Sequence, residues 1–155
     1  MSVGKPGLNW SGSGGLTCKC SSCTRAGVVV LPDGSPSLVL SDAAGKRAAS
    51  LSMRSDGTPG LALSDAAGKP RANLYLLPDG SPDLALYDAA GKTRAIMSLT
   101  KDNAPYLGLG DKNGILRAIL GAARLTAAKT EEVTIRPESS LVLFDKDGKV
   151  IWEAP

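Results

Sequence analysis

The sequence contains no histidine, few aromatic residues and no long apolar run. The absence of imidazole excludes histidine-based acid–base catalysis and histidine-ligated metal sites. No stretch approaches the roughly 18–20 apolar residues that a membrane-spanning helix needs. The N-terminus also lacks the charged start and apolar stretch of a secretory signal. We therefore expect no membrane span and, by default, a cytoplasmic location, with assembly outside the cell as the alternative.

The charges do not form the basic stripe that nucleic-acid binding needs. The 155 residues include 18 Lys and Arg and 15 Asp and Glu. Residues 1–32 contain Lys5, Lys19 and Arg25 and no acidic residue, so the remainder is neutral with 15 charges of each sign. A nucleic-acid-binding domain concentrates its positive charge on one surface. We predict no nucleic-acid partner.

The chain has only three cysteines, Cys18, Cys20 and Cys23, which follow a Gly/Ser-rich stretch. A structural zinc site takes four ligands, and neither a fourth Cys nor a His is present. The CxxC pair lacks the strand-to-helix context that lowers a thiol pKa. We therefore predict no metal and no cofactor. An intermolecular disulfide or thiol site at these cysteines and thiols without a specific role both stay open.

Four blocks of 23 residues occupy the middle of the chain, and they dominate every other signal. A fixed period of this length is typical of repeat proteins, in which each unit packs only against its neighbours. The boundaries are about 31–53, 54–76, 77–99 and 100–122, followed by a divergent end unit at 133–155. We predict an N-terminal flexible arm over residues 1–26 and a β-repeat domain over residues 27–155. Residues 121–136 interrupt the period, and we expect one or two strands or a short helical turn there.

Apolar residues alternate within each block, which predicts two half-buried strands per block. In the loop at 77–81, Gly80 suits the left-handed position of a three-residue hairpin turn, and Asn103 takes the equivalent place in the fourth block. We read Asp65-Ala66-Ala67-Gly68 as a four-residue loop that pairs Leu63 with Pro70 and Leu61 with Ala72. Both loops keep the leucines on one face, which we expect to point inward.

The predicted fold is therefore all-β, an antiparallel hairpin meander of about ten short strands. It closes as a barrel, as a sandwich or by oligomerisation. A β-solenoid with 23-residue coils stays open as the alternative.

Two features lie outside the leucine pattern. Small residues alternate with the leucines, which suggests that the second face is covered as well. Arg71, Arg94 and Arg117 recur after the Gly loops. We expect these arginines to form exposed ion pairs with Asp residues. The alternative is that they form an anion-facing ladder, a row of side chains that binds an anionic ligand. Trp152 stands where earlier blocks have Ala, and we expect it to plug an open end of the core.

The blocks follow the pattern DGxPxLxLxDxxGKxRAxLxL, and residues 137–152 form a related closing segment. Over residues 27–155 this pattern resembles the hairpin repeats of uncharacterised bacterial proteins, which implies a β-hairpin repeat fold and brings no known activity. The units are also similar in length to MORN-type repeats, which form scaffolds. MORN units are rich in Tyr, Trp and Gly, so that likeness is one of topology.

The sequence predicts a non-enzymatic structural protein that self-assembles as a homo-oligomer or filament, with the N-terminal arm contacting neighbours. A meander with one leucine face must close on itself or pair with another chain. The alternative is a β-barrel module that binds a small apolar or carbohydrate ligand in its lumen.

Overall fold

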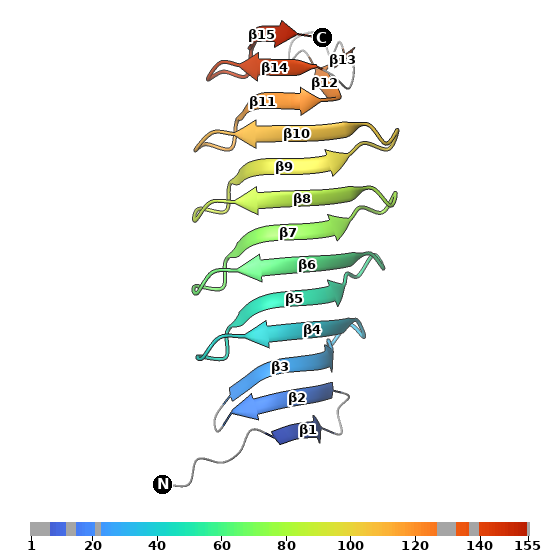
Figure 1. Ribbon diagram of the computed structural model, residues 1–155, viewed down its shortest axis with the longest axis vertical. Coiled ribbons are helices and arrows are strands. Elements are labelled where there is room, and N and C mark those ends of the chain that lie inside the picture. The colour runs from blue at the N-terminus through green and yellow to red at the C-terminus, as the bar shows by residue number, and fades with distance from the viewer. Residues whose placement is uncertain (1–6, 12–14, 21–22, 127–132, 137–139, 155) are drawn as a thin grey trace. The chain divides into compact units, whose positions relative to one another are not determined.

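The computed structural model describes residues 7–11, 15–20, 23–126, 133–136 and 140–154, and all its regular elements are β-strands (Figure 1). The predicted all-β class is confirmed. The strands form two compact units, an N-terminal unit of residues 1–78 and a C-terminal unit of residues 79–155.

The N-terminal unit is a meander in which each strand pairs antiparallel with the next one along the chain. The predicted arm contributes the first strands of this meander, and the boundary at residue 26 stays a prediction. The strands are β1 (Gly7–Ser11), β2 (Gly15–Cys20), β3 (Cys23–Val30), β4 (Pro36–Ser41), β5 (Arg47–Met53), β6 (Pro59–Ser64) and β7 (Pro70–Leu76).

The C-terminal unit continues the same pattern and adds a small ribbon. Its main sheet contains β8 (Pro82–Tyr87), β9 (Thr93–Leu99), β10 (Pro105–Gly110), β11 (Leu116–Gly121), β14 (Leu141–Phe144) and β15 (Val150–Ala154). Between β11 and β14, the strands β12 (Ala123–Thr126) and β13 (Val133–Arg136) form a separate two-stranded sheet. The segment that breaks the period thus contains strands.

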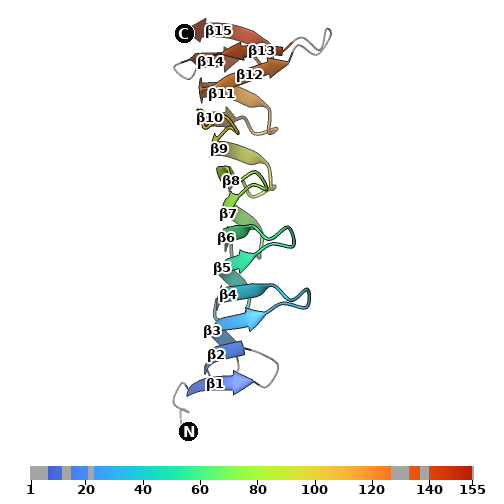
Figure 2. The same ribbon diagram turned by 90° about the vertical axis from the view of Figure 1, so that its right-hand side faces the viewer.

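The antiparallel pairing settles the choice between meander and solenoid, because stacked solenoid coils require parallel ladders. Within the described part of each unit, no ladder joins the first strand to the last, so neither sheet closes into a barrel. In the N-terminal unit the strands form a single layer (Figure 2). The predicted lumen and the predicted sandwich are therefore not formed within that unit.

The Asp-Gly loops between blocks are three-residue hairpin turns, as predicted. In the loop at Arg54, the Arg54 N–H donates to the Thr58 carbonyl at 2.8 Å and the Gly57 N–H donates to the Arg54 carbonyl at 2.9 Å. Gly57 has a φ of 81°, and Asn103 occupies the equivalent position with a φ of 61°. Asn tolerates this left-handed conformation better than other residues with a Cβ atom.

The predicted register of the second loop type is wrong by two residues along β7. Leu63 lies opposite Ala72, and Leu61 lies opposite Leu74. The loop has three residues rather than four, because the Asp65 N–H donates to the Lys69 carbonyl at 2.9 Å. A β-bulge at Leu63 and Ser64 then inserts one extra residue, which returns the leucines to one face.

The leucines do not point into a core within one chain. The buried hydrophobic cluster of the C-terminal unit consists of Ile119, Val142 and Phe144, which lie on the face opposite the leucines. Among the described side chains of the N-terminal unit, the buried residues are Gly27, Ser37 and Ser50. Within the described part of the N-terminal unit, a single sheet layer leaves the leucines partly exposed, and their burial by another chain stays a prediction.

Candidate interaction surface

Over the described side chains of β3 to β7, one face of the N-terminal unit consists of apolar side chains. We call it the leucine face. Antiparallel pairing places side chains of the same parity on the same side of a sheet, and the register aligns Val28, Leu38, Leu51, Leu61 and Leu74 in one continuous row across five strands. Large side chains on this face are between 37% and 54% exposed; they are Val28, Val30, Leu38, Leu40, Leu51, Met53, Leu61, Leu63, Leu74 and Leu76.

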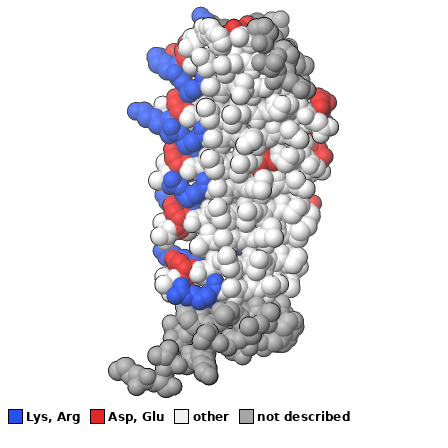
Figure 3. Space-filling view, in the orientation of Figure 1, with Lys and Arg blue, Asp and Glu red and all other residues white. Residues whose placement is uncertain are grey.

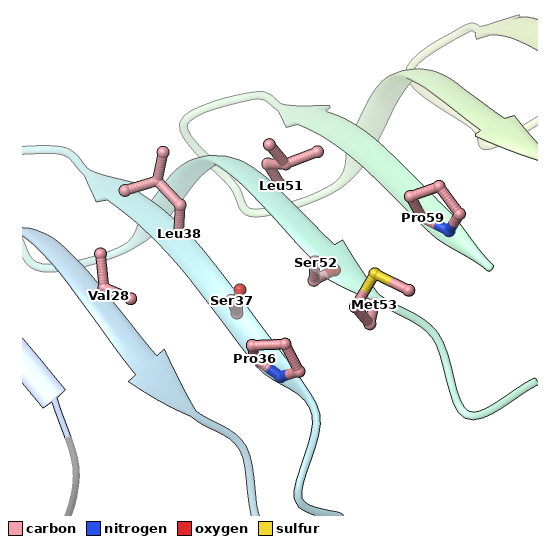
Figure 4. A pocket seen from close by; sticks show the side chains of 8 residues that line it. All are labelled: Val28, Pro36, Ser37, Leu38, Leu51, Ser52, Met53 and Pro59. Carbon is pink, nitrogen blue, oxygen red and sulfur yellow. The ribbon is translucent and has the colours of Figure 1, made fainter. Parts of the chain in front are cut away.

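The leucine face contains an open apolar groove of about 290 Å³ (Figure 4). The row formed by Val28, Leu38 and Leu51 makes its floor and one side, and prolines at the starts of β4 and β6 flank Met53 at the other. The two serines of its lining, Ser37 and Ser52, alternate with these residues along β4 and β5. The groove therefore offers dispersion contacts and almost no hydrogen-bonding groups.

The C-terminal unit presents a leucine face of its own. The register pairs Leu84 with Met97, Met97 with Leu107 and Leu107 with Leu120. It then continues through Leu141 to Ala154. The large exposed side chains on this face are Leu86, Met97, Leu109, Leu120 and Trp152.

Trp152 is the aromatic member of this face. It lies opposite Leu143 in the β14–β15 ladder, and its side chain is 49% exposed. Trp152 does not plug the core, because that core lies on the other side of the sheet. Ile151 is the extra residue of the bulge between the pairs at Leu143 and Phe144.

In each unit, charged side chains gather at the strand ends that the Asp-x-x-Gly loops connect (Figure 3). The strands beside these loops are mostly uncharged (Figure 3). Each loop is organised by its Asp. The Asp65 Oδ1 accepts hydrogen bonds from the Ala67 N–H at 2.9 Å and the Lys69 N–H at 3.0 Å. The Lys46 Nζ donates to the Ala66 carbonyl of the neighbouring loop at 3.0 Å. The charges thus form a rim that alternates in sign.

Two of the three recurring arginines lie beside the Asp of their own loop. The Arg71 Nη1 is 3.8 Å from the Asp65 Oδ2, and the Arg94 Nη1 is 3.6 Å from the Asp88 Oδ2. The Arg94 Nε also donates to the Gly110 carbonyl at 3.0 Å. The Arg117 Nη1 is buried without a hydrogen-bond partner in the structure. Ion pairs with Asp account for Arg71 and Arg94, and an anion-facing role for the ladder stays a prediction.

The loop hydrogen bonds perturb the carboxyl groups in one direction. The Lys92 N–H that donates to Asp88 lowers the pKa of Asp88 below its usual 3.8. The Lys149 N–H has the same effect on the pKa of Asp145, and the Thr58 hydroxyl lowers the pKa of Asp56. In each case the bonds favour the carboxylate over the neutral acid. These aspartates therefore stabilise turns in their charged form.

The side chains of Cys18, Cys20 and Cys23 lie outside the described part of the structure. Their backbone belongs to β2 and β3, and the register pairs Cys20 with Cys23 across the hairpin. A disulfide or thiol role for these residues stays a prediction. Over the described residues, the structure shows no group of three His, Cys, Asp or Glu side chains that can hold a metal ion. No helix among them is long and apolar enough to cross a membrane.

Sequence reasoning found the leucine pattern but missed the groove and the exposed Trp152. Parity defines which residues share a face, but it does not say whether another layer covers that face. The signal for Trp152 was present as the single large residue at a position that the blocks otherwise fill with Ala.

No protein-family model matches the chain, and no curated protein matches it either.

Proposed function

We propose that this protein is a structural module that self-assembles by packing the leucine face of one copy against that of another. The observation that supports the proposal is the continuous apolar surface of the N-terminal unit, where ten large side chains are 37–54% exposed. Soluble monomers rarely expose contiguous apolar patches larger than roughly 300–600 Å². Sheets that pack face to face bury such side chains in a layer about 10 Å thick.

The size of the surface fits a dimer interface. Complete burial of a Leu side chain stabilises by up to about 3 kcal/mol. At about 25 cal/mol per Å², this free energy corresponds to about 120 Å² of apolar surface. A half-exposed side chain therefore offers about 60 Å², and ten offer about 600 Å². Stable interfaces bury about 800 Å² per partner. The C-terminal unit has a leucine face of its own, with five large exposed side chains.

The charges favour a second copy over a lipid surface as the partner. Helices and patches that bind anionic membranes are rich in Lys and Arg on their polar side. The rim of this sheet instead alternates Asp with Lys and Arg, and Arg71 and Arg94 lie beside Asp residues. An apolar centre inside a polar rim is the arrangement of protein–protein interfaces.

Size-exclusion chromatography with multi-angle light scattering tests the proposal, over a range of protein concentrations and with a thiol reductant present. We expect a mass that exceeds 15.9 kDa and rises with concentration. A mass of one chain at every concentration up to about 100 μM contradicts the proposal, because a half-buried apolar surface of this size should give a tighter complex.

A further inference from the structure

We propose that Trp152 of one copy inserts into the groove on the leucine face of a second copy. This inference rests on the proposed function, since it names the contact that fixes how two leucine faces pair. The groove is lined by the Val28, Leu38 and Leu51 row together with Met53.

The groove needs a large apolar side chain to fill it. Its volume is about 290 Å³, and its lining offers mainly aliphatic carbon and the Met53 thioether (Figure 4). A void of this kind forfeits dispersion contacts when two faces are pressed together. The leucines of a partner face cannot fill the groove, because they all extend to about the same height above their own sheet and none projects beyond its neighbours.

Trp152 is the side chain that suits the groove. Among the side chains that the structure describes, every other large exposed one on either leucine face is aliphatic or a methionine. Trp152 occupies the position that is Ala in the four blocks, namely Ala49, Ala72, Ala95 and Ala118. Its side chain therefore extends further from the sheet than the small side chains at the equivalent positions. Interface hot spots are enriched in Trp, and they fill pockets on the partner. A methionine thioether is also a favourable neighbour for an aromatic ring.

Symmetry makes the contact reciprocal. In a two-fold dimer, a contact from residue i to residue j is repeated from j to i. Trp152 belongs to the C-terminal unit and the groove to the N-terminal unit. A two-fold dimer therefore contains two such contacts, each made by the Trp152 of one copy.

A photo-cross-linking experiment locates the contact. Trp152 is replaced by the photoreactive amino acid p-benzoylphenylalanine, whose aromatic ketone inserts readily into C–H bonds next to a methionine sulfur. The labelled chain is mixed with an isotopically heavy wild-type chain and irradiated, and mass spectrometry identifies the cross-linked peptides. We expect light-to-heavy cross-links within residues 28–59, centred on Met53. The same amino acid at Leu120, on the leucine face of the C-terminal unit but away from Trp152, should give few cross-links to Met53.

Two variants supply an independent readout. Trp152 offers about 75–125 Å² of exposed surface, because an aromatic side chain spans about 150–250 Å² and half of it is exposed. Trp152→Ala should therefore raise the dissociation constant by about 25-fold to 200-fold for each inserted ring. Ile151→Ala is the matched control, since Ile151 is more exposed but is the unpaired residue of the bulge. It should leave the constant unchanged.

The outcomes separate this inference from the proposed function. A complex that forms normally in Trp152→Ala, or that cross-links outside residues 28–59, overturns the insertion of Trp152 and leaves self-association standing. A chain that is monomeric by light scattering overturns both. Equal losses in Trp152→Ala and Ile151→Ala also overturn the insertion, because they indicate damage to the β14–β15 hairpin.

Discussion

A charge placed at the centre of the leucine face should abolish self-association while leaving the single chain folded. Leu61 is the site of choice, because it lies in β6 between Leu51 and Leu74 and is 39% exposed. Leu61→Ala measures the apolar contribution of this position. Leu61→Asp adds the cost of burying an unpaired carboxylate in the complex.

The magnitude follows from the surface that is still exposed in one chain. Complete burial of a Leu is worth about 1.5–3 kcal/mol, so the exposed 39% corresponds to about 0.6–1.2 kcal/mol per copy. Two copies in a symmetric dimer give about 1.2–2.4 kcal/mol, which raises the dissociation constant by about 8-fold to 60-fold. An unpaired charge buried in an interface costs several kcal/mol more, so Leu61→Asp should weaken the dimer by over about 1,000-fold.

Sedimentation equilibrium gives the dissociation constants, and urea unfolding at low protein concentration gives the stability of the single chain. Ala66→Asp is the matched control, because it adds the same charge in an exposed loop residue away from the leucine face. A dimer that persists in Leu61→Asp refutes the reasoning. So does equal weakening by Ala66→Asp, which would assign the effect to net charge rather than to the leucine face.

Two further predictions concern folding. Gly121→Ala should destabilise the C-terminal unit far more than Gly148→Ala in thermal unfolding. Both glycines have positive φ values, but a Cβ at Gly121 collides with the Pro105 carbonyl, whereas a Cβ at Gly148 meets nothing; Gly148→Ala should cost about 1–2 kcal/mol. Stability should also fall at acidic pH. The pKa values of four loop carboxyl groups lie below 3.8 in the folded chain; they are those of Asp33, Asp56, Asp88 and Asp145. Their contribution to the free energy of unfolding is therefore complete above pH 3.8 and is lost as the pH falls below that value. Asp88→Asn should reduce the fall of the urea unfolding midpoint between pH 4 and about 2 without removing it, because the other aspartates still titrate. An unchanged pH profile contradicts the role of this loop carboxylate.

Local chemistry made the strands and half of the loops predictable from the sequence. The period-two alternation around Leu61 and Leu63 has one interpretation, and Gly57 and Asn103 occupy the left-handed positions that their residue types favour. Each of these features depends on neighbours within one block. Local reasoning therefore identified the hairpins and the residues that share a face.

The second loop type was missed because one side chain changes the pairing. The Asp65 carboxylate accepts from the Lys69 N–H, and this bond helps to make Asp65 and Lys69 the closing pair of a three-residue loop. Without a bulge, such a loop would turn Leu63 to the opposite face, because a shift by one residue reverses every side chain. Counting parity alone cannot distinguish a four-residue loop from a three-residue loop with a bulge.

The candidate surface was harder to predict, because coverage of a face is not a local property. The same alternation occurs in a closed barrel, a sandwich and a single layer. The small residues opposite the leucines suggested a covered second face. Ser37 and Ser50 are buried on that face, but the N-terminal unit is a single layer (Figure 2), so a cover over this face stays a prediction. The leucines themselves stay exposed in one chain, which no pattern within a 23-residue block can show.

The repeat also creates a problem that Trp152 solves under the proposed pairing. Each block presents nearly the same leucines, so two faces displaced by one block of 23 residues bury almost the same apolar surface. Register is weakly specified wherever a surface repeats without a distinguishing feature. Among the described side chains of the leucine faces, Trp152 is the aromatic one, and its fit to the groove beside Met53 makes one register better than the displaced ones, by the dispersion contacts that they lack. Trp152→Ala copies that carry the photoreactive amino acid at Leu120 and still associate at high concentration should therefore do so in several registers, which appear as a broad set of cross-links. The divergent end of the chain, and not the repeat itself, then decides whether the leucine faces form one defined dimer.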